Sequence, residues 1–309
     1  MARYPPPGRC IQLASGPSLH VYSQGDNAGR TVVFEAGIAG SCLSWSLVQP
    51  LVAKFAHAVS YDRAGLGWST GSLTPRTVTN MVAELAAVLE AAKLASPYVL
   101  VGHSFGCLLI QAFAHAYPAR TAALVMVDPV TQTGWAQASA QEIRRLNAGA
   151  RLARRGAWLA RLGIVRAALS LLVSGGTKFP RLVARASAGQ GNRVLERLIG
   201  EIRKLPPETH PMIAAHWSRA RSFTALAAYL ECLPACAQQA LNMPLSAEIP
   251  LTILSAASAT IDELAERAAW TAANQNARHI QVEGTGHWLQ LERPELVASV
   301  IQEAVSGVR

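Results

Sequence analysis

The stretch PYVLVGHSFG, residues 97–106, decides the fold of this chain. It joins a short apolar run to the pentapeptide GHSFG, and the helical pattern CLLIQAFAHAY follows directly. Two glycines in a strand-turn-helix connection permit a sharp turn in which the serine backbone is strained. The Ser104 hydroxyl then stands clear of the sheet, at the positive N-terminus of the next helix. The stretch therefore predicts a nucleophilic serine at this turn.

Similar short apolar runs recur along the chain and end at Gly, Pro or Asp, which is typical of buried parallel strands. Helical patterns with one apolar side lie between them. This alternation predicts the α/β class, with a mainly parallel central sheet flanked by helices. The expected strands are 31–35, 56–61, 97–102, 121–127, 249–255 and 278–283, and the expected helices are 77–93, 108–117, 261–274 and 294–305.

Residues 131–245 break the alternation. They are rich in Ala, Arg and Leu and show no clear strand pattern, so we expect a helical insertion. The predicted organisation is a first core segment at residues 1–130, a helical cap at 131–245 and a second core segment at 246–309. A chain of 309 residues is long enough for one α/β domain that carries such a subdomain.

A serine is a weak nucleophile unless a base takes its proton. His287 follows the last expected strand, within the sequence EGTGHW, and α/β proteins place their sites in loops at the carboxyl ends of strands. His103 adjoins the serine, but its side chain must point away from that of Ser104. We therefore expect His287 to be the general base.

Four motifs together resemble the α/β-hydrolase fold family, especially its capped bacterial members: EAGIAGS, YDRAGLGWS, GHSFG and EGTGHWLQLERPE. The resemblance covers residues 20–130 and 246–305, and it implies a helical cap inserted after the sixth strand. It also implies an oxyanion hole built from the backbone N–H groups of Phe105 and Ile38. Ala36 stands where the family usually has His, but the donor is a main-chain group and should survive.

The acid of the triad is the open position in this resemblance. The family usually carries it after the seventh strand, within a Gly-x-x-Asp pattern, but residues 254–262 read LSAASATID and place Asp262 late. Some relatives carry the acid at the end of strand six, where this chain has Asp128 in the sequence LVMVDP. We expect Asp128 to orient the imidazole and to stabilise its cation, with Asp262 as the reserve.

The loop motif DRAGLGWS is expected to be structural. Asp62 and Arg63 would brace it, and its glycines allow tight turns. Glu35, close to the expected oxyanion hole, is a candidate partner for Arg63.

The expected activity is hydrolysis of a carboxylic ester, lactone or thioester through an acyl-enzyme on Ser104. C–C bond hydrolysis, acyl transfer and cofactor-free perhydrolysis on the same triad are the enzymatic alternatives. A non-catalytic ligand-binding protein is the alternative of another class. A dehalogenase or epoxide hydrolase is disfavoured, because those relatives use Asp where this chain has Ser104. No P-loop, dinucleotide fingerprint or metal-ligand cluster stands out, so we expect no cofactor and no metal.

Positive charge is concentrated in the insertion. Residues 131–245 hold 16 Lys and Arg against 5 Asp and Glu, a balance of +11, whereas the rest holds 12 against 14, a balance of −2. Such a segment predicts contact with an anionic lipid or an anionic substrate. The alternative is that the arginines are simply solvated on outer helix faces. No nucleic-acid-binding motif stands out, so no nucleic acid is expected as a partner.

Within the insertion, residues 151–166 carry the densest run of arginines. Arginine mixed with Trp and aliphatic side chains suits an interface with anionic lipid. Gly156 and Gly163 argue against a continuous helix there. If the helix is continuous, the residues that share an arc of about 140° are Arg151, Arg154, Arg155, Arg161 and Arg166, with Trp158, Leu162 and Val165.

No apolar stretch reaches membrane-spanning length, and the N-terminal sequence MARYPPPGR has no apolar segment of signal-peptide type. We therefore expect a cytoplasmic protein. Peripheral contact with a membrane through the cap is a further option.

Overall fold

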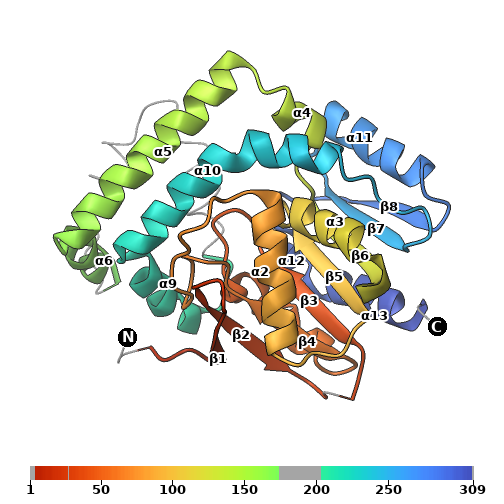
Figure 1. The fold of residues 1–309 in the computed structure, drawn as a ribbon, viewed down its shortest axis with the longest axis horizontal. Helices are drawn as coiled ribbons and strands as arrows, with labels where there is room; N and C mark the ends of the chain where they lie inside the picture. The colour runs from red at the N-terminus through yellow and green to blue at the C-terminus, as the bar shows by residue number, and fades with distance from the viewer. Residues whose placement is uncertain (1–3, 27, 174–202, 308–309) are drawn as a thin grey trace.

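One central sheet carries the fold in the computed structural model, which describes residues 4–26, 28–173 and 203–307 (Figure 1). The strands lie in the order β1-β2-β4-β3-β5-β6-β7-β8. β2 is antiparallel to both its neighbours, and the strands from β4 to β8 run parallel. The strands are β1 Arg9–Gln12, β2 Ser18–Gln24, β3 Thr31–Glu35, β4 His57–Tyr61, β5 Tyr98–His103, β6 Thr121–Val127, β7 Leu251–Ala256 and β8 Ala277–Val282.

The α/β class and the mainly parallel sheet are confirmed, and the six expected strands are β3 to β8, with some ends shifted by one or two residues. The strands β1 and β2 were not expected. β1 is mostly exposed and β2 mixes polar with apolar residues, so neither forms the continuous apolar run of a strand buried on both faces.

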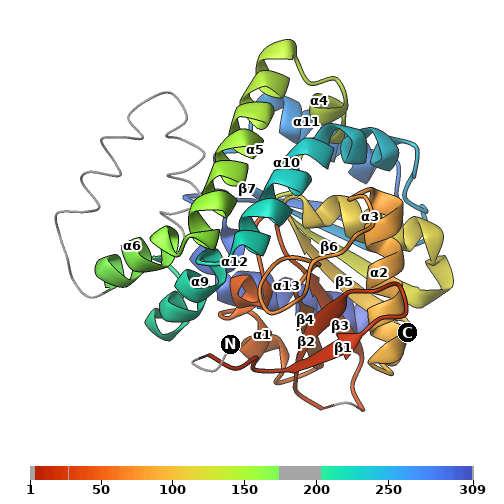
Figure 2. The same ribbon diagram turned by 60° about the vertical axis from the view of Figure 1, so that its left-hand side comes forward.

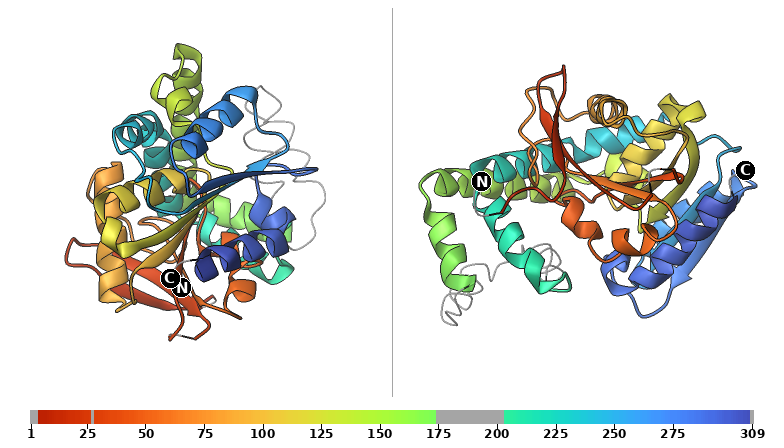
Figure 3. Two further views of the ribbon diagram at one scale, coloured as in Figure 1. Left: turned by 90° about the vertical axis from the view of Figure 1, so that its right-hand side faces the viewer. Right: turned by 90° about the horizontal axis from the view of Figure 1, so that it is seen from below.

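Alternate residues of the central strands face two separate cores, as the period of a β-strand requires. Tyr98 and Leu100 of β5 belong to the core beneath α2 and α3, whereas Val99 and Val101 belong to the core beneath α1 and α13. Figure 3 shows α2 and α3 on one face of the sheet and α13 on the other. The helices of the core are α1 Gln49–Val52, α2 Val78–Ala91, α3 Gly106–Ala116, α11 Ile261–Ala272, α12 Leu289–Glu292 and α13 Pro294–Gly307, with 3₁₀ turns at Cys42–Trp45 and Pro118–Arg120.

The described residues between β6 and β7 form helices and no strand, as expected for the insertion (Figure 2). Its residues 174–202 lie outside the described part of the chain. The division into core and cap domains at 130/131 and 245/246 stays a prediction. The helices are α4 Gln132–Ala136, α5 Ala140–Arg161, α6 Ile164–Val173, α9 His210–Trp217 and α10 Ala220–Leu241, with a 3₁₀ turn at Pro207–Thr209.

The helices α5 and α10 lie side by side along the insertion (Figure 1). Gly156 fits inside α5 because a Cβ there would lie 2.7 Å from the Phe223 ring of α10. The idea of one continuous helix over residues 151–166 is wrong. α5 ends at Arg161, and Gly163 takes the left-handed φ of 76°, which starts α6 in a new direction. Among the described helices, none is long and apolar enough to cross a membrane.

Candidate active site

Ser104 lies at the turn between β5 and α3, where its backbone takes the left-handed φ of 55°. Non-glycine residues rarely adopt this conformation, so the surrounding structure must enforce it. The flanking glycines are needed because the main chain comes close. A Cβ on Gly106 would lie 2.6 Å from the Glu35 carbonyl oxygen, and one on Gly102 would lie 3.0 Å from the Cys107 backbone. The sequence GHSFG therefore forms the expected sharp turn.

His287 lies in the loop after β8, with its Nε2 2.9 Å from Ser104 Oγ. The loop is fastened at the two residues that precede His287. The N–H of Gly286 donates to Glu292 at 2.7 Å, and Thr285 Oγ1 donates to the Val282 carbonyl at 2.6 Å. These bonds hold the imidazole against the serine hydroxyl.

His103, the residue before the serine, turns its ring to the His287 loop. Its Nε2 lies 2.9 Å from the His287 carbonyl, and its ring packs against the rings of His287 and Trp288 at 4.8 and 4.9 Å. Burial, followed by the neighbouring His287, lowers the pKa of His103 to about 3. The ring is therefore neutral at physiological pH and can donate one hydrogen bond through Nε2. His103 thus ties the strand of the serine to the loop of His287.

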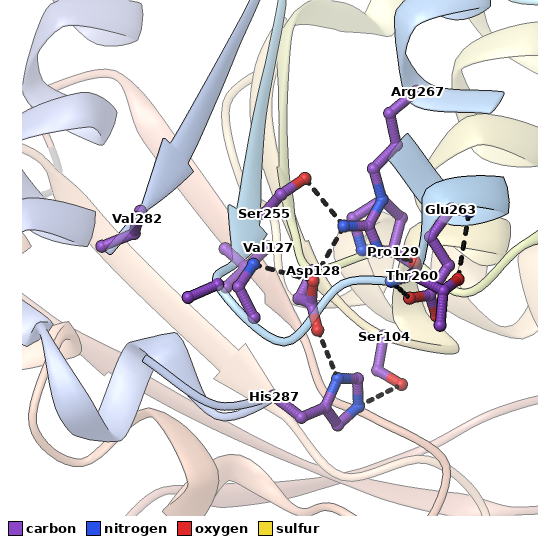
Figure 4. A network of polar contacts seen from close by, with 12 residues as sticks. Ser104, Val127, Asp128, Pro129, Ser255, Thr260, Glu263, Arg267, Val282 and His287 are labelled. Atoms are coloured by element: carbon purple, nitrogen blue, oxygen red, sulfur yellow. Dashed lines mark hydrogen bonds and ion pairs between the residues drawn. The ribbon is translucent and has the colours of Figure 1, made fainter. Parts of the chain in front are cut away.

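Asp128 follows β6 and completes a continuous hydrogen-bonded line with His287 and Ser104 (Figure 4). Its Oδ2 lies 2.6 Å from His287 Nδ1. Its Oδ1 accepts from the N–H of Ala256 at 3.0 Å and from the Arg267 guanidinium at 2.9 Å. Burial would raise the pKa of Asp128. The hydrogen bond and charge of His287, the charge of Arg267 and the N–H of Ala256 outweigh it and hold that pKa below its ordinary value. The carboxylate is therefore ionised at neutral pH.

Asp262, the reserve acid, lies elsewhere. It is exposed in the first turn of α11, where a carboxylate interacts favourably with the helix N-terminus. The structure brings Ser104, His287 and Asp128 together and leaves Asp262 outside the group.

The loop after β3, which carries Ile38, is gripped by a buried arginine. The Arg63 guanidinium pairs with Glu35 and donates to the carbonyl oxygens of residues 36–38. The expected pairing of Glu35 with Arg63 is therefore present. In the described part of the chain, no protein acceptor takes the backbone N–H of Ile38 or of Phe105. Both predicted oxyanion donors are thus free for a ligand.

Among the described residues, the metal-ligating side chains of His20, Cys42 and Asp62 gather within 4.8 Å of one another. The polar atoms of these side chains already contact protein groups. Asp62 accepts from the N–H groups of Cys42 and Trp68 at 2.7 and 2.9 Å, and His20 Nδ1 lies 2.9 Å from the same carboxylate. Burial, followed by Asp62, raises the pKa of the Cys42 thiol well above its ordinary value, which disfavours the thiolate that a metal needs. The cluster fits the expected bracing of the DRAGLGWS loop better than it fits an ion.

Arg267 is the part of the site that the sequence analysis missed. It lies on α11, three residues from both Leu264 and Trp270, and is only 1% exposed. A cation at helical spacing among apolar residues that face the core is a recognisable signal, because a buried charge needs a partner.

A model of the Alpha/beta hydrolase family matches residues 32–300. The chain belongs to this family. Among curated relatives of this α/β-hydrolase, the uncharacterized protein YqjL of Bacillus subtilis is 32% identical over 114 residues, which are 37% of this chain and 45% of the relative. A protein of Azorhizobium caulinodans named as a candidate carbamate hydrolase, RutD, is 31% identical over 128 residues, 41% of this chain and 46% of the relative. The matched stretches thus span less than half of either relative.

Solved structures of the same fold superpose over nearly the whole α/β-hydrolase chain. A loop variant of the haloalkane dehalogenase DbeA from Bradyrhizobium elkanii gives a TM-score of 0.70 at 18% identity, covering 96% of each chain. A thermophilic esterase from Thermogutta terrifontis gives 0.67 at 17% identity, covering 97% of this chain and 99% of the other. At such identities the likeness shows the fold, and chemistry must be argued from the site.

Proposed function

We propose that this α/β-hydrolase is a serine hydrolase that cleaves a carboxylic ester, lactone or thioester through an acyl-enzyme. Ser104 would be the nucleophile, His287 the general base and Asp128 the acid that orients it. The observation that carries the proposal is the continuous contact from Ser104 Oγ through both ring nitrogens of His287 to Asp128, at 2.9 and 2.6 Å. This arrangement supplies the base that a serine needs and a carboxylate that fixes the tautomer of that base.

In this mechanism His287 Nε2 takes the proton of Ser104 as its Oγ attacks the substrate carbonyl carbon. The carbonyl oxygen becomes an oxyanion that the N–H groups of Ile38 and Phe105 stabilise, each worth about 3–4 kcal/mol in the barrier. The carboxylate of Asp128 stabilises the imidazolium. His287 then gives the proton to the leaving alcohol or thiol, and water hydrolyses the acyl-enzyme by the same steps.

The structural likeness to a haloalkane dehalogenase does not extend to the nucleophile. The family's dehalogenases attack through a carboxylate, and this chain has Ser104 at the corresponding turn. The name of the RutD relative makes a carbamate the first substrate class to compare with esters. Carbamates present a carbonyl carbon that bears one nitrogen and one oxygen, and a serine can attack it as it attacks an ester, so one site can be tested against both.

The test is a burst experiment with nitrophenyl esters of graded acyl length, with a carbamate series beside it. We expect a burst of nitrophenol equal to the enzyme concentration and a fluorophosphonate label on Ser104. Ser104→Ala should remove the burst and the label and lower turnover by roughly 10⁴-fold or more. Ser299→Ala removes an exposed hydroxyl on α13; it is the matched control and should keep both the burst and the label.

A label on another serine, with activity kept in Ser104→Ala, would contradict the assignment of Ser104 as the nucleophile. Ligand binding without turnover would favour the non-catalytic alternative.

We also propose that the outer face of α5 and α6 contacts anionic lipid, which would make a cytoplasmic enzyme a peripheral membrane protein. Large apolar side chains are exposed there, with Leu152 at 63%, Trp158 at 59% and Leu162 at 57%. Arg151 and Arg155 are exposed on the same helix. Arginine and tryptophan on one face match a surface that is both anionic and apolar, whereas water alone favours only the charges.

The five arginines of this region are not equivalent. Arg154 is bonded to Glu231 of α10 at 2.6 Å, so its charge is partly neutralised. Arg151 and Arg155 are therefore the better candidates for lipid contact.

A further inference from the structure

Arg267 is a fully buried cation that is bonded to the carboxylate at the end of β6 and to two groups close to it. Its Nη1 donates to Asp128 Oδ1 at 2.9 Å and to Ser255 Oγ at 2.7 Å, and its Nη2 donates to the Pro129 carbonyl at 2.6 Å. Ser255 Oγ in turn lies 2.6 Å from His279 Nε2. Figure 4 shows the guanidinium on the side of Asp128 opposite the imidazole of His287. The two carboxylate oxygens thus serve different partners.

The main chain at Asp128 explains why such a partner is needed. Asp128 has a left-handed φ of 44°, and its N–H donates to the Leu254 carbonyl at 2.7 Å. Its side chain therefore leaves β6 from a strained turn. Ala256 and Arg267 hold Oδ1, so Oδ2 is fixed toward His287 Nδ1. A carboxylate with a single partner could rotate away from the imidazole.

The guanidinium also acts on charge. An imidazolium at His287 is stabilised by the negative charge of Asp128, and a buried cation on the far oxygen offsets part of that charge. The guanidinium therefore weakens the electrostatic attraction between Asp128 and a protonated imidazole. We propose that Arg267 is a positioning residue that fixes the orientation and effective charge of Asp128, and thereby sets the pH at which His287 becomes an active base. This inference rests on the proposed function of the same site.

Most other titratable groups around this network are uncharged or bonded elsewhere. Glu292 accepts from the N–H of Gly286 beside His287 through Oε2, and its Oε1 is paired with Lys204. His103 on β5 is neutral, since burial and His287 lower its pKa to about 3. Burial raises the pKa of the Cys107 thiol on α3, and burial, then Arg267, lowers that of His279 on β8. Burial raises the pKa of Glu266 on α11, whose carboxylate accepts from the N–H of Gln132 at 2.7 Å. Among the described residues, Arg267 is therefore the one permanently charged cation in contact with Asp128.

The experiment measures the pH profile of kcat/KM for Arg267→Gln and Arg267→Lys. Arg267→Gln keeps a donor and loses the charge, so the acidic limb of the profile should move up by about one pH unit. Arg267→Lys keeps the charge but has a single donor centre for three acceptors. Its limb should stay within about 0.3 pH units of the wild type while kcat falls severalfold, because orientation suffers and charge does not.

Arg76→Gln is the matched control, because Arg76 forms another buried ion pair, with Glu84, away from the catalytic line. It should lose comparable stability without moving the limb. The second readout needs no turnover: NMR titration of the His287 ring in histidine-labelled protein, with the signal identified by its loss in His287→Asn. A displaced titration in Arg267→Gln without ester turnover in any variant would support Arg267 while refuting the proposed function.

Two results would overturn the proposal. One is an acidic limb and a His287 titration that stay at their wild-type pH in Arg267→Gln. The other is a limb that moves equally in Arg267→Gln and Arg76→Gln, which would mean a general loss of packing. If Arg267→Gln does not fold, Arg267→Lys decides. An unchanged titration with a reduced kcat supports the proposal, and a displacement of about one pH unit despite the retained charge contradicts it.

Discussion

Arginines occupy two opposite settings in this protein. Arg63 and Arg267 are 4% and 1% exposed, and each guanidinium is bonded to a carboxylate and to at least one main-chain carbonyl oxygen beside the candidate site. Arg151 and Arg155 on α5 are exposed, next to an exposed tryptophan, Trp158. The first pair holds the loops of the site in place, whereas the second pair faces outward.

The difference shows what net charge can and cannot tell. A buried guanidinium must be matched at once by partners, because taking it out of water is costly. Its effect is therefore local, on the orientation and the charge of the groups that it contacts. An exposed guanidinium costs little and acts on whatever approaches from outside, over about 8–10 Å at ordinary salt. The net charge of +9 counts both kinds alike, although only the exposed kind can attract a partner.

The largest expected effect comes from neutralising Asp128, the carboxylate that the buried Arg267 contacts. Asp128→Asn should lower kcat by about 10³–10⁴-fold, because the amide favours the wrong tautomer of His287 and no longer stabilises its cation. Asp262→Asn, on the exposed first turn of α11, is the matched control and should change kcat less than about twofold. Steady-state kinetics at pH 8 checks both. The opposite ranking would move the acid to the loop after β7.

A second test concerns the seam between insertion and core, where His216 of α9 meets Trp68 edge to face at 4.2 Å. Burial, foremost, lowers the pKa of His216 to about 4 from its ordinary 6.5. Between pH 4 and 6.5, His216 therefore binds a proton in the unfolded chain but not in the folded protein. The free energy of unfolding falls as the pH drops from about 6.5 to 4. The loss from this residue is of the order of 3 kcal/mol.

Urea unfolding at pH 7 and pH 4.5 measures that effect. His216→Phe keeps a ring beside Trp68 and should lose less stability on acidification than the wild type. His115→Phe, at an exposed position late in α3, should behave like the wild type. Equal acid sensitivity of the two variants would remove His216 as the cause.

The smallest expected effect concerns the exposed arginines of α5 and their binding to anionic lipid. Arg151→Gln with Arg155→Gln should weaken binding to phosphatidylserine vesicles by about 30-fold, at about 1 kcal/mol for each charge. Turnover of a short soluble ester should not change. Lys54→Gln with Arg278→Gln removes the same net charge elsewhere and should leave vesicle binding almost unaltered. No co-sedimentation of the wild type with anionic vesicles at low salt would mean that these arginines are only solvated.

The sequence predicted the parts of the fold that depend on local pattern. GHSFG between an apolar strand and a helix places Ser104, and apolar runs that end at Gly, Pro or Asp mark the parallel strands. Asp128 could be proposed because the stretch after β7 holds no well-placed carboxylate. The strands β1 and β2 escaped, because β1 is an exposed edge strand and β2 mixes polar with apolar residues, so neither shows a continuous apolar run.

Arg267 escaped for a different reason. It lies 139 residues from Asp128 in the chain, and its guanidinium reaches that carboxylate only once α11 packs beside β7 and β8. The break at Gly163 depended on backbone geometry that glycine permits but does not require. Long-range pairing and optional bends are therefore two further features that a single sequence leaves open.

Pro129 has a consequence for how the insertion can move. Pro129 directly follows Asp128, and the chain then leads into α4. A displacement of the insertion would therefore be transmitted through Pro129 to the carboxylate of Asp128. The Arg267 guanidinium holds the Pro129 carbonyl as well as Asp128 Oδ1. The chain is thus anchored to α11 at the root of the insertion. A displacement of the insertion helices would therefore meet this anchor before it reached the carboxylate of Asp128.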